Sequence, residues 1–422
     1  MSKTQTELRA FSANTTPIHP PLVEGKGARV RDVEGREYID CVSQTLNLNL
    51  GQCHDDVVAA VVEQARRLTY ASSRFASDVS LELHDKLVEI TPEPLDKVNM
   101  ASVIGSAANE CALKAARKRT GRRTVVSVVG SHHGQTTESM RASGKHWDRS
   151  YLGERNARFV PAPDCSRCPF KLRPETCSVE CLDTLDEIWE QEDGDVCAVL
   201  VEPIMVDAGV LVPPRKYHER LRAFCDEFDI ALVHDEIQTA FGWLGVTFAS
   251  EIYDVVPDLL SLGKGLGAGY PLAATVFTEE YDVLTYGEHE MTAGAHVISC
   301  AASLAMLRYL YAEGRFEEIR EKGAFARSRL ERLVEDHPVL GEVRGVGLLL
   351  GLEIVDPADG DPDEEAALRV VRGLRDEGVI LRLGNVGNGS AVLQFKPPVV
   401  IGYDDLELVF SALDRVLARA DA

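Results

Sequence analysis

The chain has 422 residues, 45% of them hydrophobic, which is enough to bury a large core in two or more subdomains. Its formal net charge of −22 argues against nucleic acid or an anionic membrane as a partner. No apolar stretch approaches the length of a bilayer span, and the first residues lack the apolar core of a signal peptide. The ten cysteines are typical of reduced thiols, so we expect a soluble cytoplasmic protein.

The N-terminal region predicts an arm followed by a hairpin and two helices. Residues 1 to about 20 are polar and then proline-rich, which is typical of a loose arm. Residues 28–40 predict a hairpin that turns at Glu34-Gly35, and helical patterns follow at about 55–69 and 79–90.

A third helix is predicted from Ser106 to Thr120, where small and apolar residues share helical spacing. Ser106, preceded by Gly105, is a good N-cap residue, and the backbone N–H groups at a helix start form an anion site. A capped helix without any ligand is an equally good interpretation of this feature alone.

From about 97 to 277, short apolar runs alternate with helical segments. Four runs predict buried strands: 125–129, 198–201, 230–233 and 272–277. This alternation is typical of an α/β domain with a mainly parallel sheet. Ligands of such sheets bind beyond the carboxyl ends of the strands, so polar residues there are site candidates.

Two of these strand ends carry titratable residues. His132 and His133 follow the strand at 125–129, and either could stack on a flat cofactor or act as a base. Adjacent histidines in a loop are more often solvated or bonded to backbone. Glu202 ends the strand at 198–201 and predicts either a substrate contact or a structural ion pair.

Four cysteines lie in a polar, proline-containing insertion: Cys165, Cys168, Cys177 and Cys181. Four thiolates could bind zinc tetrahedrally, but the spacing within the second pair and between the pairs is unusual. A loop of reduced thiols is the favoured interpretation.

Asp235 and Lys264 are the most informative pair. Asp235 ends the strand at 230–233, and Lys264 lies among the glycines of residues 263–269. The glycines enter the next strand instead of opening a helix, which excludes a dinucleotide-binding loop. An exposed amine and a buried carboxylate that can hold a proton on a heteroaromatic nitrogen together suggest a lysine-bound pyridoxal phosphate enzyme.

The C-terminal part predicts helices at about 299–312 and 315–335 and strands at 347–354 and 392–395. It indicates a smaller α+β domain. We therefore divide the chain into an N-terminal arm and hairpin that belong to the small domain (1–54), a large cofactor-binding domain (55–298) and a C-terminal small domain (299–422).

From about residue 25 to 415 the chain resembles the class III pyridoxal phosphate aminotransferases. The motifs that carry this resemblance are 105–110, the His-Gly loop at 132–134, Glu202-Pro203, 235–239, Lys264 and Pro397-Pro398. The stretches 265–274 and 343–351 look most similar to 2,2-dialkylglycine decarboxylase and ω-aminotransferases. The resemblance implies fold type I, with a seven-stranded sheet in the large domain, and a homodimer with active sites at the subunit interface.

The resemblance also implies roles for individual residues. Lys264 would bind the cofactor's aldehyde covalently and act as proton shuttle, and Asp235 would pair with the pyridine N–H. Gln238 would contact the ring hydroxyl. Gly105 and Ser106 would hold the phosphate at the helix start.

Three positions depart from the pattern of the relatives. His132 stands where they usually place a larger aromatic ring on the cofactor. Ala295 stands where a threonine from the neighbouring subunit helps to hold the phosphate. Gln394 stands where many relatives bind a substrate carboxylate with arginine, so either Lys396 or Arg382 takes over or the substrate lacks that group.

The favoured function is amino-group transfer between an amine or amino acid donor and a keto acceptor, by a ping-pong route. Decarboxylation and racemisation or epimerisation are alternatives on the same cofactor. Thr45 falls near the substrate-side glutamine of the decarboxylase, with Gln44 beside it. A non-catalytic relative that binds zinc through its cysteines is a further alternative, and the presence of both Asp235 and Lys264 argues against it.

Overall fold

The computed structural model describes residues 20–72, 74–146, 150–153, 156–384 and 391–420. The predicted N-terminal arm lies almost entirely outside these residues. Within them the strands form three sheets, with orders β4-β10-β9-β8-β7-β5-β6, β1-β2-β3-β13 and β11-β12-β15-β14. No helix in the described part is long and apolar enough to cross a lipid bilayer.

The central sheet has seven strands among the described residues. They are β4 (Leu95–Ser102), β5 (Thr124–Val128), β6 (Ala157–Val160), β7 (Val196–Val201), β8 (Ala231–Asp235), β9 (Leu259–Leu262) and β10 (Ala273–Thr278). Strands β5 to β9 pair in parallel, whereas β10 is antiparallel to both β9 and β4. This confirms the predicted α/β fold with a mainly parallel sheet.

Two smaller sheets flank the central one. The first contains β1 (Leu22–Lys26), β2 (Arg29–Asp32), β3 (Glu37–Asp40) and β13 (Val379–Ile380); the second contains β11 (Leu340–Val346), β12 (Leu349–Ile354), β14 (Arg382–Leu383) and β15 (Val392–Phe395). The predicted hairpin corresponds to β2 and β3, and β3 pairs in parallel with β13. The division into domains at 54 and 298 stays a prediction.

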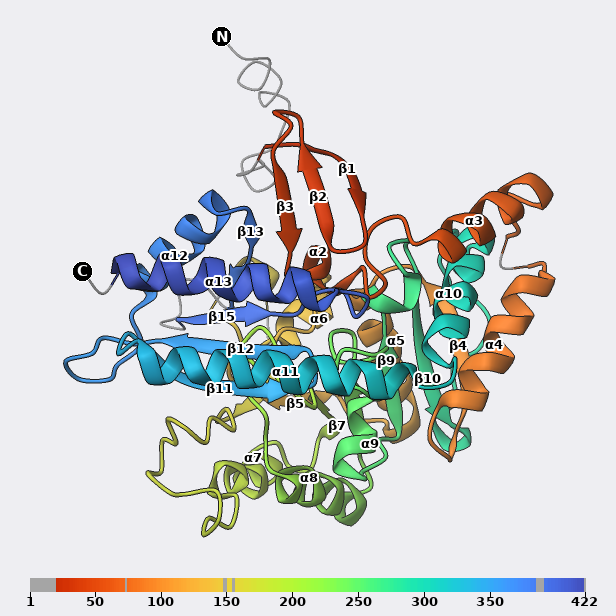
Figure 1. Ribbon diagram of the computed structural model, residues 1–422. Coiled ribbons are helices and arrows are strands. Elements are labelled where there is room, and N and C mark those ends of the chain that lie inside the picture. The colour runs from red at the N-terminus through yellow and green to blue at the C-terminus, as the bar shows by residue number, and fades with distance from the viewer. Residues whose placement is uncertain (1–19, 73, 147–149, 154–155, 385–390, 421–422) are drawn as a thin grey trace.

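Helices pack around these sheets. They are α2 (Ser43–Leu46), α3 (Asp55–Arg67), α4 (Asp78–Ile90), α5 (Gly105–Thr120), α6 (Thr137–Ala142), α7 (Thr184–Gln191), α8 (Arg215–Phe228), α9 (Ala249–Tyr253), α10 (Val297–Leu310), α11 (Arg315–Asp336), α12 (Glu364–Asp376) and α13 (Tyr403–Ala420). In Figure 1, α3, α4 and α10 gather at one side of the molecule, α7 and α8 lie below the central sheet, and α11 and α13 run beside β11, β12 and β15.

The sequence of the central strands explains their position. Every residue of β7 (VCAVLV) and β8 (ALVHD) is buried, and such continuous runs are typical of parallel strands covered on both faces. Helix α5 contacts β9 and β10 and buries five alanines, whose small side chains allow a close approach to the sheet: Ala107, Ala108, Ala112, Ala115 and Ala116.

The element α2 is a left-handed turn. All four of its residues have positive φ angles, 49° at Ser43, 46° at Gln44, 68° at Thr45 and 61° at Leu46. Each costs about 1–2 kcal/mol for an L-residue without glycine's freedom. The buried carboxylate of Asp40 holds the turn, since it accepts hydrogen bonds from Val42 N, Gln44 N and Gln44 Nε2.

Candidate active site

Asp235 lies at the carboxyl end of β8 and is 3% exposed. Its Oδ2 atom accepts hydrogen bonds from His133 Nδ1 at 2.7 Å and from Asn109 Nδ2 at 2.8 Å. Its Oδ1 atom accepts one from Ile237 N at 3.1 Å. Both oxygens are therefore fixed in orientation by groups from α5, β8 and the loop after β5.

These hydrogen bonds keep Asp235 ionised. Burial alone raises the pKa of a carboxyl group, but the bonds from His133, Asn109 and Ile237 outweigh it, so that the pKa of Asp235 lies below its usual value. Because the carboxylate is charged, His133 Nδ1 must carry the proton and donate it. His133 Nε2 lies 3.0 Å from Ser127 Oγ, which fixes the ring at its other side.

Lys264 lies two residues after the end of β9, at the start of a 3₁₀ helix (Lys264–Gly267), and has a positive φ of 42°. It is close to Asp235 because β9 pairs with β8, with Ser261 opposite Asp235. Burial lowers the pKa of Lys264, and Asp207, Asp235 and Glu202 oppose that shift. A desolvated amine with a lowered pKa is easier to deprotonate, which both nucleophilic attack and proton abstraction require.

A cavity of about 340 Å³ brings Lys264 and the start of α5 together. Its lining includes the following residues: Asn47, Ile104, Gly105, Lys264, Tyr270 and Pro271. The backbone is tightly packed here, because a Cβ atom on Gly105 would lie 2.6 Å from Ile237 Cδ1. Only glycine fits at this position without a shift of Ile237.

The predicted serine cap of α5 is wrong. The helix begins at Gly105 and its N-cap residue is Ile104, so Ser106 lies inside the first turn. The Ser106 hydroxyl oxygen instead accepts a hydrogen bond from Gln135 N at 3.1 Å. The first backbone N–H groups of a helix have no intrahelical partner, and the anion site predicted at 105 and 106 stays a prediction.

The two adjacent histidines have different surroundings. His132 is half-buried, and its backbone N donates to Glu202 Oε1 at 2.8 Å. Burial, with Lys145 and Lys264 nearby, lowers the pKa of His132 to about 4. Its ring is therefore neutral at pH 7 and can stack on a flat group. His133, in contrast, bonds Asp235, a role that sequence reasoning missed, as it missed that of Asn109.

Glu202 shapes the loop after β5. Its Oε1 atom accepts from His132 N, its Oε2 atom accepts from Val206 N at 3.4 Å, and burial raises its pKa to about 7. This arrangement corresponds to the structural interpretation of Glu202. Its predicted contact with substrate stays a prediction.

A profile of the Aminotransferase class-III family matches residues 10–417. The chain is 36% identical to an acetylornithine aminotransferase of Methanopyrus kandleri over 96% of this chain and 97% of that protein, and 34% identical to a leucine/methionine racemase of Thermococcus litoralis over 98% and 94%. The PLP-bound amine transaminase of an uncultivated Pseudomonas species superposes with a TM-score of 0.88 at 29% identity, over 97% of both chains.

The chain belongs to the class III aminotransferases. It is therefore a pyridoxal phosphate-dependent enzyme of fold type I that moves amino groups between amine or amino acid donors and keto acceptors.

The residues of this class III aminotransferase fit the cofactor. Gln238 is 5% exposed, and neither its amide nitrogen nor its amide oxygen has a partner among the described residues, although a buried amide is normally hydrogen-bonded. A ring hydroxyl would supply the missing partner. Asp235 offers an ionised carboxylate for the ring nitrogen, Lys264 offers the amine, and the start of α5 offers N–H groups for a phosphate.

Thr45 and Gln394, two predicted substrate residues, lie in different surroundings. Thr45 is exposed on the left-handed turn, two residues before Asn47 at the cavity. Gln394 is fully buried, and both ends of its amide are occupied: Nε2 donates to Val206 O at 2.8 Å, and Oε1 accepts from Lys396 Nζ at 2.6 Å. Each end of the Gln394 amide therefore already has one protein partner, and its predicted contact with substrate stays a prediction.

Ala295, another position that departs from the class III pattern, lies in the loop before α10. Ala295 has a positive φ of 48°, and its backbone N donates to Met100 O at 2.8 Å. The carbonyl oxygen of the nearby Thr292 accepts a hydrogen bond from Tyr70 at 2.6 Å. The part that this loop plays in holding the phosphate stays a prediction.

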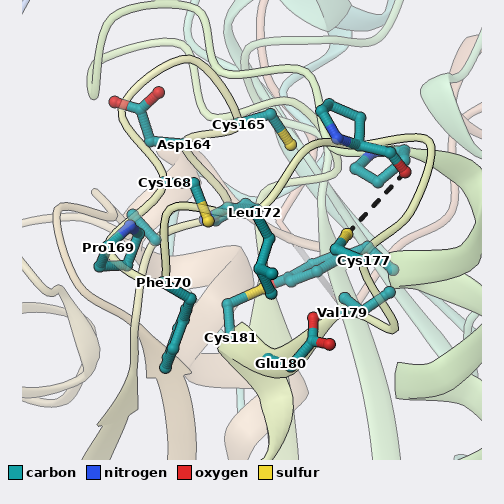
Figure 2. Close-up of a pocket in the computed structure, with 15 residues that line it drawn as sticks. Asp164, Cys165, Cys168, Pro169, Phe170, Leu172, Cys177, Val179, Glu180 and Cys181 are labelled. Atoms are coloured by element: carbon teal, nitrogen blue, oxygen red, sulfur yellow. Dashed lines mark hydrogen bonds between the residues drawn. The ribbon is translucent and has the colours of Figure 1, made fainter.

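The four cysteines of the insertion surround one small space. Together with Tyr217, they line a cavity of about 30 Å³. Figure 2 shows Cys165, Cys168, Cys177 and Cys181 around this space. All ten cysteines are free thiols. Within the described residues, however, no group of three or more His, Cys, Asp or Glu side chains is arranged to hold a metal ion. The zinc alternative gains no support from this arrangement.

Proposed function

We propose that Lys264 is the residue that binds the cofactor covalently and moves the substrate proton in amino-group transfer. The observation that carries this proposal is the position of Lys264 beside an ionised, three-times hydrogen-bonded Asp235 and the start of α5. When bound, pyridoxal phosphate supplies an electron sink that stabilises negative charge on the substrate carbon.

Each residue then has a defined task. Asp235 would keep a proton on the ring nitrogen of the bound cofactor, and His133 and Asn109 hold Asp235 in place. The neutral His132 would cover one face of the ring, and the unpartnered amide of Gln238 would bond its hydroxyl. Lys264 Nζ removes the proton from the substrate carbon that bears the amino group, since burial lowers the pKa of its amine and makes the neutral, basic form easier to reach.

The test uses Lys264→Ala with a panel of amine and amino acid donors. The variant should lose both the visible absorbance of the lysine-bound cofactor and the conversion of the cofactor by any donor. Lys322→Ala is a suitable control because Lys322 is also buried but lies on α11 and bonds Val399 O. Donor conversion that persists in Lys264→Ala and is lost in Lys322→Ala would contradict the proposal.

Racemisation or epimerisation of an amino acid is the second candidate, because a relative as similar as 34% is a leucine/methionine racemase. The two functions differ in what happens without a keto acceptor. A racemase exchanges the α-proton of L-leucine with D₂O and forms the D-isomer. An aminotransferase converts its cofactor to the amine form and stops, so chiral analysis of single-donor reactions decides between them. Decarboxylation would show as release of CO₂.

We also infer that the enzyme is a homodimer whose active sites lie at the interface. In support, the rim of the Lys264 cavity includes Ile104, which is 50% exposed, and large apolar side chains such as Phe75 and Tyr286 are exposed too. A second copy would cover such surface. Light scattering coupled to size-exclusion chromatography should give twice the chain mass, and a monomer with full activity would contradict the inference.

Finally, we infer a cytoplasmic enzyme acting on small amine, amino acid and keto substrates. Ten free thiols suit a reducing compartment, and the charge of −22 disfavours nucleic acid and anionic membranes. Cell fractionation with detection of the native protein tests the location, and recovery in a membrane or secreted fraction would contradict it.

A further inference from the structure

The β6–α7 connection, residues 161–183, carries four of the ten cysteines of the chain. Its cysteines, which we call the thiol cluster, are Cys165, Cys168, Cys177 and Cys181. Five of the other cysteines are buried, and Cys53 is exposed on its own. Each thiol of the cluster is half-buried, so it lies near other thiols and is still within reach of a small reagent.

The backbone of the β6–α7 connection folds back on itself. Residues 161–179 are all described and form bends and turns without a helix or strand. Lys171 and Val179 have positive φ angles of 57° and 66°, which are typical of tight turns. The first limb carries Cys165 and the second limb carries Cys177, and both residues line the same small cavity (Figure 2).

This cavity is too small for an organic ligand. Its volume of about 30 Å³ is enough for a water molecule, which needs roughly 10–15 Å³. Most of its other lining residues are apolar, among them Phe170, Leu172 and Tyr217. The arrangement suits a reaction of the thiols with one another, because a void of this size lets neighbouring side chains rotate into contact.

Lys216 of α8 lies beside both Cys165 and Cys177. Its Nζ atom donates to the carbonyl oxygens of Pro174 and Cys177, each at 2.6 Å. Burial raises the pKa of the Cys165 thiol, Cys177 and Cys168 add to the rise, and the charge of Lys216 opposes it. Because a nearby cation favours the thiolate, which is the reactive form of cysteine, Lys216 promotes reaction at this pair.

The other two thiols are less suited to link the limbs. Cys181 lies in the short 3₁₀ helix Glu180–Leu182, and burial raises the pKa of its thiol to about 12. A thiol with such a pKa is almost entirely protonated at neutral pH and reacts slowly. Cys168 lies on the same limb as Cys165, so a bond between these two would leave the limbs unjoined.

We propose that Cys165 and Cys177 form a reversible disulfide when the protein meets hydrogen peroxide, and that this bond closes the β6–α7 connection into a loop. The proposal is independent of amino-group transfer at Lys264. Transient disulfides of this kind serve redox sensing in reducing compartments.

The reaction is balanced by the peroxide. One thiolate of the pair attacks a peroxide oxygen, the O–O bond breaks, and the sulfur becomes a sulfenic acid while hydroxide leaves and is protonated to water. The thiolate of the second cysteine attacks the sulfenic sulfur, the S–S bond forms, the S–O bond breaks and a second water leaves. The two thiols thereby lose two protons and two electrons, which reduce one hydrogen peroxide to two waters.

The closed loop would contain Arg167, which joins the connection to the C-terminal sheet. Arg167 Nε donates to Glu353 Oε1 of β12 at 3.1 Å, and its NH2 atom donates to Gly360 O at 2.8 Å. Lys216 holds the second limb to α8 through Cys177 O. A bond between the limbs would therefore restrict the segment that contacts both α8 and β12.

The first experiment uses the full chain with Cys53→Ser, which removes the exposed thiol outside the thiol cluster. The protein is treated with one equivalent of hydrogen peroxide, and its thiols are counted in denaturant before and after dithiothreitol. Two thiols for each chain should be lost and then recovered. Peptide mapping without reductant should show Cys165 joined to Cys177.

Trypsin gives a second readout, because Arg167 and Lys171 lie between Cys165 and Cys177 in the sequence. A chain cut at either residue separates into two fragments on a denaturing gel when it is reduced. The fragments should stay joined after peroxide treatment until dithiothreitol is added.

Single variants in the Cys53→Ser background identify the pair. Cys165→Ser and Cys177→Ser should each abolish the link between the tryptic fragments. Cys168→Ser and Cys181→Ser are the matched controls from the same cavity and should retain it. The peptide map of the parent protein needs no further substitution, so it decides the pairing even if one variant folds poorly.

Lys216→Met tests the cation and should slow disulfide formation at pH 7 by about 3- to 10-fold, up to the effect of one pKa unit. Lys216→Arg should keep most of the rate. Lys86→Met is the matched control, since Lys86 is also half-buried but lies on α4. Because burial raises the pKa of Cys165, the rate should continue to rise above pH 8.5, the ordinary thiol pKa being about 8.5.

Each contrary result has a defined meaning. No loss of thiols, or a loss that dithiothreitol does not restore, would overturn the disulfide. A link that persists in Cys165→Ser or Cys177→Ser, or that joins two chains, would overturn the assigned pair. An unchanged rate in Lys216→Met would overturn the role of Lys216 and leave the disulfide standing.

Discussion

His133 Nδ1 donates a hydrogen bond to Asp235 Oδ2 over 2.7 Å, and neither side chain is accessible to solvent to any useful degree. The imidazole that reaches the central carboxylate is thus the second of the two adjacent histidines, while the first remains beside Lys264. Removing this bond would leave Asp235 in the site but without the hydrogen bond that fixes its orientation.

We predict that His133→Ala lowers the turnover number by about 10- to 100-fold, the range found when a hydrogen bond that orients a ligand is removed. Asp235 would keep two of its bonds, and its pKa would rise because burial would be less opposed. His133→Gln, which retains a donor, should recover part of the activity. The pH profile is the decisive readout: the acid limb should move to higher pH in His133→Ala.

Gly105→Ala should weaken cofactor binding and destabilise the protein by about 1–3 kcal/mol, the usual effect of overpacking. The added methyl group would meet Ile237 at 2.6 Å and displace the first turn of α5. Gly402→Ala is a suitable control, because a Cβ atom there meets nothing within 4 Å. Urea unfolding with and without cofactor measures both effects, and equal stability of the two variants would contradict the prediction.

The protein should lose stability as the pH falls from about 6.5 towards 4. The buried His218 has its pKa lowered to about 4 by burial, and His234 beside it is shifted in the same direction. Below the unfolded pKa the unfolded chain takes up a proton that the folded chain does not, so stability falls; at pH 5 the His218 contribution is about 2 kcal/mol. Urea unfolding at pH 8 and pH 5 measures the loss, which should be smaller in His218→Gln.

Asp40→Ala should destabilise the left-handed turn by about 3 kcal/mol, because one buried and one partly buried backbone N–H group would lose their acceptor. Asp40→Asn should be milder, since its carbonyl oxygen can still accept one bond. Asp359→Ala removes a similar bond, to Asp361 N, in an exposed turn and should have little effect. Comparable unfolding midpoints for Asp40→Ala and Asp359→Ala would show that the carboxylate does not hold the turn.

The sequence predicted the α/β architecture and singled out Asp235 and Lys264, because the patterns that mark them are local. Continuous apolar runs marked β7 and β8. The glycines around Lys264 predicted a loop, but Lys264–Gly267 forms a short 3₁₀ helix. The serine cap failed for a simple reason: Gly105 adopts helical geometry itself, so the helix starts one residue before Ser106.

The remaining features depend on contacts between distant segments. Asn109 and Asp235 meet across 126 positions, and nothing in either local sequence identifies the other. Likewise, the sequence showed Gln394 only as a position where relatives have arginine. Its pairing with Arg382 and its hydrogen bond with Lys396 appear only in the folded structure. The left-handed turn was not foreseen either, because it is maintained by one carboxylate and not by glycines.

The parallel pairing of β3 with β13 bears on how the protein is made. During synthesis the strands β1 to β3 leave the ribosome long before Val379 and Ile380 exist, so their sheet lacks its fourth strand for most of translation. Exposed strand edges of this kind are prone to wrong pairing. A chain truncated before Val379 should therefore leave the edge of β3, near the N-terminus, without its partner strand.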